Sequence, residues 1–178
     1  IRPTATADAW ELIGPDSVFG RRIFLQGCIR FLAGLENRSA DDDELLDTLR
    51  AHDDGVEQLF VLADEQGQVP ATNLADARDL AHGLYLALTR REAIGETFNI
   101  GPAAPHGEDE LVRHIGAALG LRVVVISRPH VRPSWYVSSA KARGILGYRP
   151  QHTVFGMVDE AVAAQRIGAS VADFPAAG

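Results

Sequence analysis

Residues 108–126 read EDELVRHIGAALGLRVVVI, and this stretch decides the fold class. The pattern predicts a helix from about Glu108 to Leu119 that ends at Gly120, because a glycine commonly closes a helix. The run from Leu121 to Ile126 that follows is apolar and β-branched, which is typical of a buried parallel strand. A helix that leads directly into such a strand indicates a sheet covered by helices.

Strands and helices also alternate on both sides of this unit. Leu59–Leu62 predicts a short strand that ends in a turn, and Glu96–Ile100 predicts another strand that ends at Gly101. Asp79 is the expected N-cap of a helix that runs to about Arg91. Further helices are expected over Val18–Leu35, Ser139–Leu146 and Val154–Ile167. The alternation predicts an α/β fold.

Composition restricts the kinds of partner that the chain can have. It has 178 residues, of which 46% are apolar, and no apolar run approaches the roughly 20 residues of a membrane span. A formal charge of −7 disfavours nonspecific binding to nucleic acid or to an anionic membrane. The single cysteine, Cys28, cannot form an internal disulfide, which fits a reducing compartment. We therefore expect a soluble, cytoplasmic protein with neither a nucleic-acid nor a membrane partner.

Acidic residues are concentrated between Glu36 and Gln58. Ser39 is a candidate N-cap with Asp42 three residues later, and Leu45, Leu46 and Leu49 follow on one face. This pattern predicts a short amphipathic helix whose acidic side is solvated, with its first acids at the positive end of the helix dipole.

Several patterns that resemble catalytic or metal sites are better explained structurally. No GxGxxG loop is present, and Gly116 with Gly120 fits close helix packing. Tyr136 and Lys141 are five residues apart, which on a helix would rotate the two side chains away from each other. His106, Glu110 and His114 have helical spacing, but Pro105 and Gly107 place His106 ahead of the helix, so a metal site is disfavoured. His82 has no evident acid or nucleophile partner.

One segment combines groups that suit ligand binding. It follows the predicted strand 121–126, and parallel sheets bind ligands beyond the carboxyl ends of their strands. Arginine can bind a phosphate or carboxylate through two bonds, and Trp or Tyr can stack on a flat or sugar ring. A loop pinned by aromatic packing is an equal alternative. The residues concerned are Arg128, His130, Arg132, Trp135 and Tyr136.

Five short motifs, in this order, resemble a known family. They are Ile1-Arg2-Pro3 with Gly14-Pro15, Ala77-Arg78-Asp79-Leu80-Ala81, Gly95–Gly101 (GETFNIG), Ser139–Arg143 (SAKAR) and Leu146–Pro150 (LGYRP). Together they resemble the NAD(P)-dependent sugar epimerases and dehydratases of the extended short-chain dehydrogenase/reductase family.

The resemblance covers only the carboxyl-terminal half of that family. In the family, the dinucleotide fingerprint and the Tyr-x-x-x-Lys catalytic pair lie ahead of the I-R-P strand, and this sequence contains neither. The resemblance therefore implies the C-terminal part of a Rossmann-like parallel sheet with a small α/β substrate-binding subdomain, spanning residues 1–178, without the N-terminal dinucleotide-binding half.

The resemblance also implies roles for particular residues. By family position, Pro3 and Thr4 lie near the nicotinamide of NAD or NADP, and Arg132, Trp135 and Tyr136 lie near the substrate. Thr72 stands where the family often has an arginine that binds a nucleotide-sugar diphosphate. The stretch before Gly14 is longer than the family pattern, and its Trp10 is a further candidate for the substrate site. The acidic helix at about 36–58 is interpreted as an insertion.

The motifs and the resemblance together leave two functions open. The first is the substrate-binding portion of an NAD(P)-dependent oxidoreductase that acts on a sugar, a nucleotide sugar or a related hydroxy compound, with no catalytic residue in this chain. The second is a noncatalytic ligand-binding or subunit module that pairs with a separate dinucleotide-binding chain. A homodimer, or an N-terminal half supplied in trans, would be the protein partner.

Overall fold

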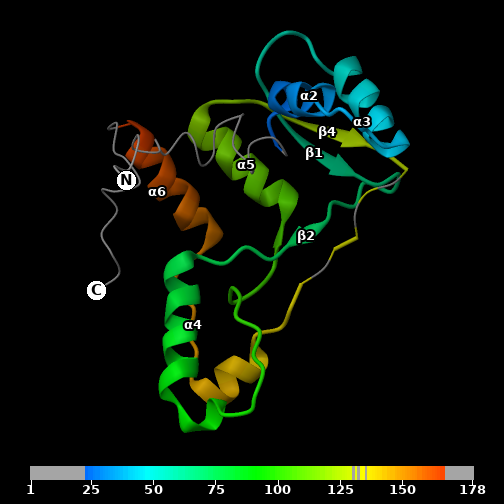
Figure 1. Cartoon of the computed structure of the whole chain (residues 1–178). Coiled ribbons are helices and arrows are strands. Elements are labelled where there is room, and N and C mark those ends of the chain that lie inside the picture. Colours follow the sequence, from blue (N-terminus) through cyan, green and yellow to red (C-terminus); the bar gives the residue numbers. More distant parts are fainter. Residues whose placement is uncertain (1–22, 130, 132, 135, 167–178) are drawn as a thin grey trace, which may run out of the picture.

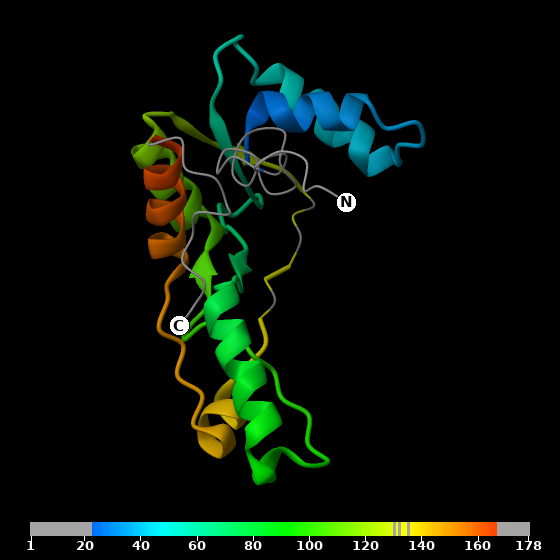
Figure 2. The same ribbon diagram turned by 60° about the vertical axis from the view of Figure 1, so that its left-hand side comes forward.

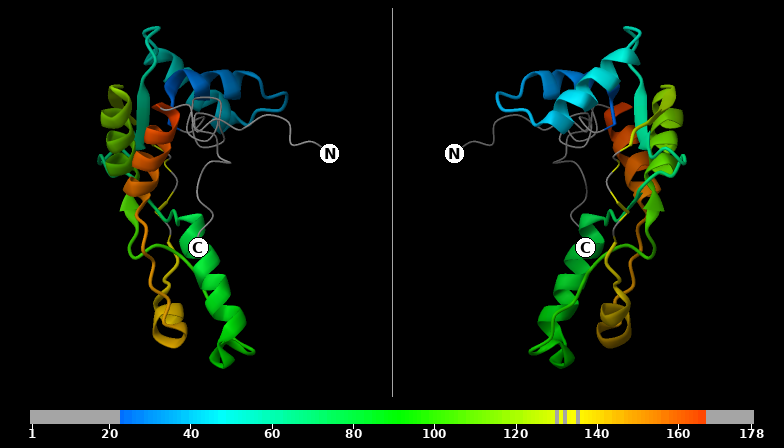
Figure 3. Two further views of the ribbon diagram at one scale, coloured as in Figure 1. Left: turned by 90° about the vertical axis from the view of Figure 1, so that its left-hand side faces the viewer. Right: turned by 90° about the vertical axis from the view of Figure 1, so that its right-hand side faces the viewer.

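A computed structural model of the chain describes residues 23–129, 131, 133–134 and 136–166. These residues form an α/β part with a smaller helical lobe at one end (Figure 1). Both views in Figure 3 show α2 (Leu25–Ala33) and α3 (Ala40–Ala51) projecting sideways at the end opposite that lobe. Within the described residues, no helix combines the length and apolarity needed to cross a bilayer.

Two parallel strands form the centre of the α/β part. In β1 (Leu59–Ala63) and β4 (Val123–Ser127), Leu59 pairs with Val123 and each following residue pairs in turn. The predicted strand at Leu59–Leu62 is confirmed, whereas the one at Leu121–Ile126 is shifted toward the carboxyl end by one or two residues. β1 is the one strand that pairs with β4 within the described residues, and Val125 is 47% exposed, so β4 is less buried than its composition predicts.

Helices α2 and α3 cover one face of this strand pair. Cys28 and Leu32 of α2 and Leu49 of α3 pack with Phe60 and Ile126 of the strands. Of the helix expected over Val18–Leu35, residues 18–22 lie outside the described residues. Phe24 is extended and forms an isolated bridge with Leu59, and the Phe60 N–H donates to the Ile23 carbonyl at 2.8 Å, so α2 begins at Leu25.

The start of α3 is as the sequence predicts. The Ser39 side chain accepts a bond from the Asp42 N–H at 3.2 Å, and the Asp42 carboxylate accepts one from the Ser39 N–H at 2.9 Å. This reciprocal pair satisfies two N–H groups at the helix start.

Helices α5 (Glu108–Leu119) and α6 (Val154–Arg166) cover the other face. Val112, Ile115 and Val158 are buried there against Leu59 and Val61, the strand residues that alternate with Phe60. α5 ends at Gly120, whose φ of 70° lies in the left-handed region that glycine tolerates, as the sequence predicts.

The helical lobe consists of α4 (Ala77–Thr89), the 3₁₀ turn η2 (Arg91–Ala93) and the π-helical turn η3 (Ala142–Leu146). α4 and η3 lie side by side, as Figure 2 shows. Leu86, Ala142, Leu146 and Tyr148 form its small core. Between the lobe and the α/β part, the short strands β2 (Ala71–Thr72) and β3 (His106–Gly107) pair antiparallel.

Two local predictions in this lobe were wrong. Glu96–Ile100 forms no strand, because no other described segment pairs with it and a strand needs a partner. The N-cap of α4 is Asp76, whose side chain accepts a bond from the Arg78 N–H at 2.7 Å. Asp79 lies inside the first turn of the helix and binds a different segment.

Candidate functional site

The candidate site begins at the carboxyl ends of β1 and β4. The Arg128 N–H donates to the Ala63 carbonyl at 2.9 Å, and the Ser127 hydroxyl donates to the Asp64 carbonyl at 3.0 Å. These bonds fix the point where the chain leaves β4 and enters the segment expected to form a ligand-binding loop. Ligands of parallel α/β sheets bind at this end of the strands.

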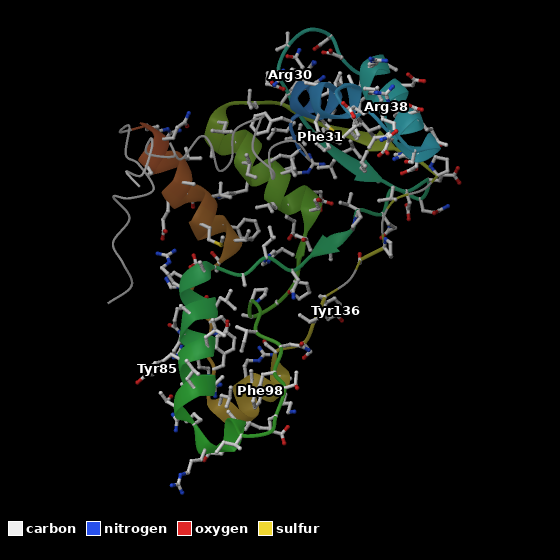
Figure 4. The ribbon with its side chains drawn as sticks, in the orientation of Figure 1. Arg30, Phe31, Arg38, Tyr85, Phe98 and Tyr136 are labelled. Atoms are coloured by element: carbon white, nitrogen blue, oxygen red, sulfur yellow. The ribbon has the colours of Figure 1, made fainter. Side chains whose placement is uncertain are left out.

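The loop then runs beside β2. The Ala71 N–H donates to the Ser134 hydroxyl at 2.8 Å, and the Asn73 side chain donates to the Val137 carbonyl at 3.5 Å. Thr72 lies between these two contacts and Tyr136 lies on the segment that makes them, so the structure brings these two predicted site residues onto neighbouring segments. Tyr136 is 60% exposed, and Figure 4 shows it on the open connection below β2.

The other predicted site residues lie outside the described residues. They are Pro3, Thr4, Trp10, Arg132 and Trp135. His130, from the same loop, also lies outside them.

His106 is the register partner of Thr72 in the β2–β3 pair. Its ring meets Phe155 edge-on at 5.9 Å between centroids, and its buried Nε2 atom has no hydrogen-bond partner. His114 is engaged elsewhere, since its Nε2 lies 2.7 Å from Asp159 Oδ1. Across the described ranges, no group of three or more His, Cys, Asp or Glu side chains is placed to hold a metal ion.

Lys141 and Tyr136 have separate environments. The Lys141 ammonium donates to Glu96 Oε2 at 2.6 Å and lies 5.1 Å from the centre of the Phe98 ring. Tyr136 lies ahead of the helical turn at 140–146, whereas Lys141 lies within it. The two side chains therefore do not share a helical face.

Arg128 is already paired within the chain. The sequence had indicated an arginine available to bind a phosphate or carboxylate of a ligand. Its side chain is 4% exposed, its Nη2 donates to Asp41 Oδ1 at 2.8 Å, and Glu44 Oε1 lies at 3.8 Å. The acidic side of α3 is therefore only partly solvated. Asp41 and Glu44 are three residues apart and share a helical face, which was the available signal, but nothing local identifies a partner 87 residues away.

Asp79 holds the start of α4 against the segment before α6. Its carboxylate accepts bonds from the Gln151 N–H at 2.9 Å, the His152 N–H at 2.9 Å and the His152 ring, whose Nδ1 lies at 3.0 Å. Burial acts to raise the pKa of Asp79, but these bonds outweigh it and the pKa is lowered. We refer to Asp79, Gln151 and His152 as the Asp79 clasp. It fixes the helical lobe relative to the α/β part.

The described residues offer no cradle for the pyrophosphate of a dinucleotide. Such a cradle is a glycine-rich turn that joins a strand directly to a helix N-terminus. In the part of the chain that the structure describes, β1 leads through the turn at 64–67 to β2, and β4 leads into an extended connection. β3 does lead directly into α5 at Gly107, but the first turn of α5 carries Glu108, Asp109 and Glu110, whose negative charge disfavours a pyrophosphate. The dinucleotide fit therefore fails for these residues.

Comparison with known proteins supplies the family context. No family model matches the sequence, and no curated protein matches it. Among solved structures, a short-chain dehydrogenase/reductase superfamily protein from Agrobacterium tumefaciens with bound NAD matches 90% of this chain, with a TM-score of 0.78 and 30% identity. The chain has the fold of part of a short-chain dehydrogenase/reductase. It spans 48% of the length of the A. tumefaciens protein.

Two further structures match this short-chain dehydrogenase/reductase chain more weakly. UDP-N-acetylglucosamine 4-epimerase from Bacillus cereus is 27% identical, with a TM-score of 0.49 over 61% of this chain and 36% of its own. dTDP-glucose 4,6-dehydratase from Bacillus anthracis is 18% identical, with a TM-score of 0.49 over 62% of this chain and 35% of its own. The A. tumefaciens structure confirms the family resemblance of the sequence.

Proposed function

We propose that the chain forms the substrate-side portion of an NAD(P)-dependent oxidoreductase of the epimerase/dehydratase type, which acts on a sugar, a nucleotide sugar or a related hydroxy compound. The observation that supports this most strongly is the likeness to the NAD-bound A. tumefaciens protein over 90% of the chain. Thr72 and Tyr136, with Trp10, Arg132 and Trp135, are the proposed substrate contacts. Pro3 and Thr4 are the proposed contacts to the nicotinamide.

In this proposal the cofactor, when bound, would supply the chemistry of hydride transfer. Its pyrophosphate would be held by a dinucleotide-binding portion other than the residues described above. The described residues bind and orient the substrate. β1 and β4 fix the start of the loop. The bonds of Ser134 and Val137 to Ala71 and Asn73 hold the segment that carries Tyr136 beside the strand that carries Thr72. No proton-transfer role is assigned to this chain.

An apolar face of α4 supports the need for such a second portion. Leu80, Leu84 and Leu88 recur every four residues with exposures of 44, 56 and 87%, and Tyr85 beside them is 63% exposed. We call these four residues the α4 stripe. Figure 4 shows Tyr85 pointing away from the lobe. Large exposed apolar patches commonly mark interaction sites.

The segment Glu96–Ile100 also lacks a strand partner among the described residues. It has a strand-like sequence, and no strand lies beside it within the described residues. A dinucleotide-binding sheet would provide both a strand for this segment and a surface for the α4 stripe. The same observation favours a second candidate, in which the chain is a subunit that pairs with a separate dinucleotide-binding chain.

The test uses the protein from its native source, purified through a carboxyl-terminal tag. Intact mass under denaturing conditions and the NAD(P) released on denaturation are measured together. We expect bound cofactor, with a mass above 19.2 kDa for the first candidate or a second co-purifying chain for the other. A single 19.2 kDa species without cofactor would contradict both. As a control, the 178-residue chain alone should not bind NAD in a calorimetric titration.

A further inference from the structure

We propose that two carboxylates of α3, those of Asp41 and Glu44, pair with the Arg128 guanidinium and so exclude phosphorylated ligands from the carboxyl ends of β1 and β4. This deepens the proposed function and rests on it for the position of the substrate. The substrate class then narrows to hydroxy compounds without a phosphate or diphosphate at this edge.

Arg128 lies where such a ligand would be bound. It follows β4 directly, and its backbone N–H continues the pairing with β1 through Ala63. A guanidinium at this end of a parallel sheet presents a fork that suits phosphate or carboxylate. In this chain the fork is covered, because the side chain is 4% exposed whereas Asp41 and Glu44 are 65 and 53% exposed. The two carboxylates therefore lie between the guanidinium and solvent.

Helix α3 holds these carboxylates in place. The Ser39–Asp42 capping pair fixes the first turn, and Leu46 and Leu49 are buried on the side of the helix that faces the sheet. Arg38 Nε donates to Asp43 at 2.6 Å, and the Arg38 guanidinium also donates to the carbonyl groups of Leu32, Ala33 and Leu35. Asp41 and Glu44 are thus presented by a pre-ordered helix.

The charge of the helix start adds to this exclusion. The first turn of α3 carries Asp41, Asp42 and Asp43, and Glu44 follows it. The two arginines that pair with these acids, Arg38 and Arg128, leave the helix start net negative. A diphosphate that approaches Arg128 would have to displace two carboxylates and remain beside the other acids. Like charges placed against an unwanted ligand are a common source of specificity.

The pair is also poorly suited to a purely stabilising role. Arg128 Nε is buried and has no hydrogen-bond partner, which leaves a desolvated donor unsatisfied. A buried ion pair can often be replaced by apolar residues without loss of stability. Specificity gives a reason for its presence that stability does not.

The experiment measures binding of inorganic pyrophosphate to the 178-residue chain by calorimetry at low ionic strength. The variant Asp41→Asn with Glu44→Gln frees Arg128. The control Glu36→Gln with Asp47→Asn removes the same charge from α3 and the residues just ahead of it. Glu36 is exposed and Asp47 pairs with Arg50, so the control leaves the Arg38 and Arg128 pairs in place. We expect no saturable binding by the wild type or the control. The first variant should bind pyrophosphate at least tenfold more tightly than the detection limit set by the wild type, and adding Arg128→Gln to this variant should abolish the binding.

Either of two results would overturn the inference: saturable binding by the wild type equal to that of the variant, or no gain in a variant that melts cooperatively. If the double variant does not melt cooperatively, Asp41→Asn alone is measured in the same way, because Asp41 makes the 2.8 Å bond. Pyrophosphate binding requires no dinucleotide, so this outcome is independent of the cofactor measurement that tests the proposed function.

Discussion

At the scale of single residues, buried groups gain their properties from partners that are distant in the sequence. Asp79 is 3% exposed and binds a segment more than seventy residues away. Because its pKa is lowered by folding, its contribution to stability is present above the ordinary aspartate pKa of about 4 and is lost as the pH falls through the lower folded-state pKa.

Replacement of Asp79 by Asn tests this role. The amide keeps one acceptor oxygen but loses the other, so we expect a loss of about 1–3 kcal/mol in the free energy of unfolding at pH 7. The acid-induced decline of stability below pH ~4 should also become shallower than in the wild type. Denaturant unfolding between pH 3 and pH 7 measures both effects, with the 81% exposed Asp47→Asn as a near-neutral control.

Cys28 provides a second test. Burial raises the pKa of its thiol to about 11, so at pH 8 about one molecule in a thousand carries the thiolate. An ordinary thiol would be about one-quarter ionised at that pH. We expect a disulfide reagent to label the native protein at least a hundredfold more slowly than the denatured protein. Equal rates would show that the packing of α2 against α3 and the strands does not bury the thiol.

At the scale of elements, close packing of α5 on the strands depends on Gly116. A Cβ atom there would lie 2.8 Å from Val123 Cγ2 and 2.9 Å from the Leu121 carbonyl oxygen, and the backbone atom cannot move aside cheaply. Gly116→Ala should therefore destabilise the fold by about 1–3 kcal/mol in chemical denaturation.

The matched control is Gly144→Ala in the helical turn of the lobe. Nothing lies within 4 Å of a Cβ atom built there, so the change should be neutral or stabilising by up to about 1 kcal/mol. If both substitutions had the same effect, close approach at Gly116 would not be the cause.

How far the sequence predicted each element depended on where its determinants lie. The start of α3 at Ser39 and the end of α5 at Gly120 are decided by neighbouring residues, and both predictions are confirmed. Glu96–Ile100 has the composition of a strand, but strand formation depends on a partner that no described segment supplies. The pairing of Arg128 with Asp41 joins residues 87 apart, so it could not be inferred from either local pattern.

At the scale of the whole molecule, the α4 stripe makes the lobe prone to association. We expect the isolated chain to self-associate at micromolar concentration because the stripe lacks a cover among the described residues. Leu84→Glu with Leu88→Glu should return it to a monomer in sedimentation velocity, whereas Val56→Glu, at a 61% exposed site in the α/β part, should not. A wild-type chain that remains monomeric would contradict this expectation.

The order of the elements along the chain has a consequence for inheritance. The helical lobe is assembled from two separate stretches, since β1 precedes α4, and both α5 and β4 intervene before η3. No single excision removes the lobe, and one recombination event between related genes would exchange only part of it. Changes in this lobe therefore involve two segments of the sequence that must remain compatible with each other. The Asp79 clasp joins α4 to the stretch that follows η3, so changes on either side of it must preserve this contact.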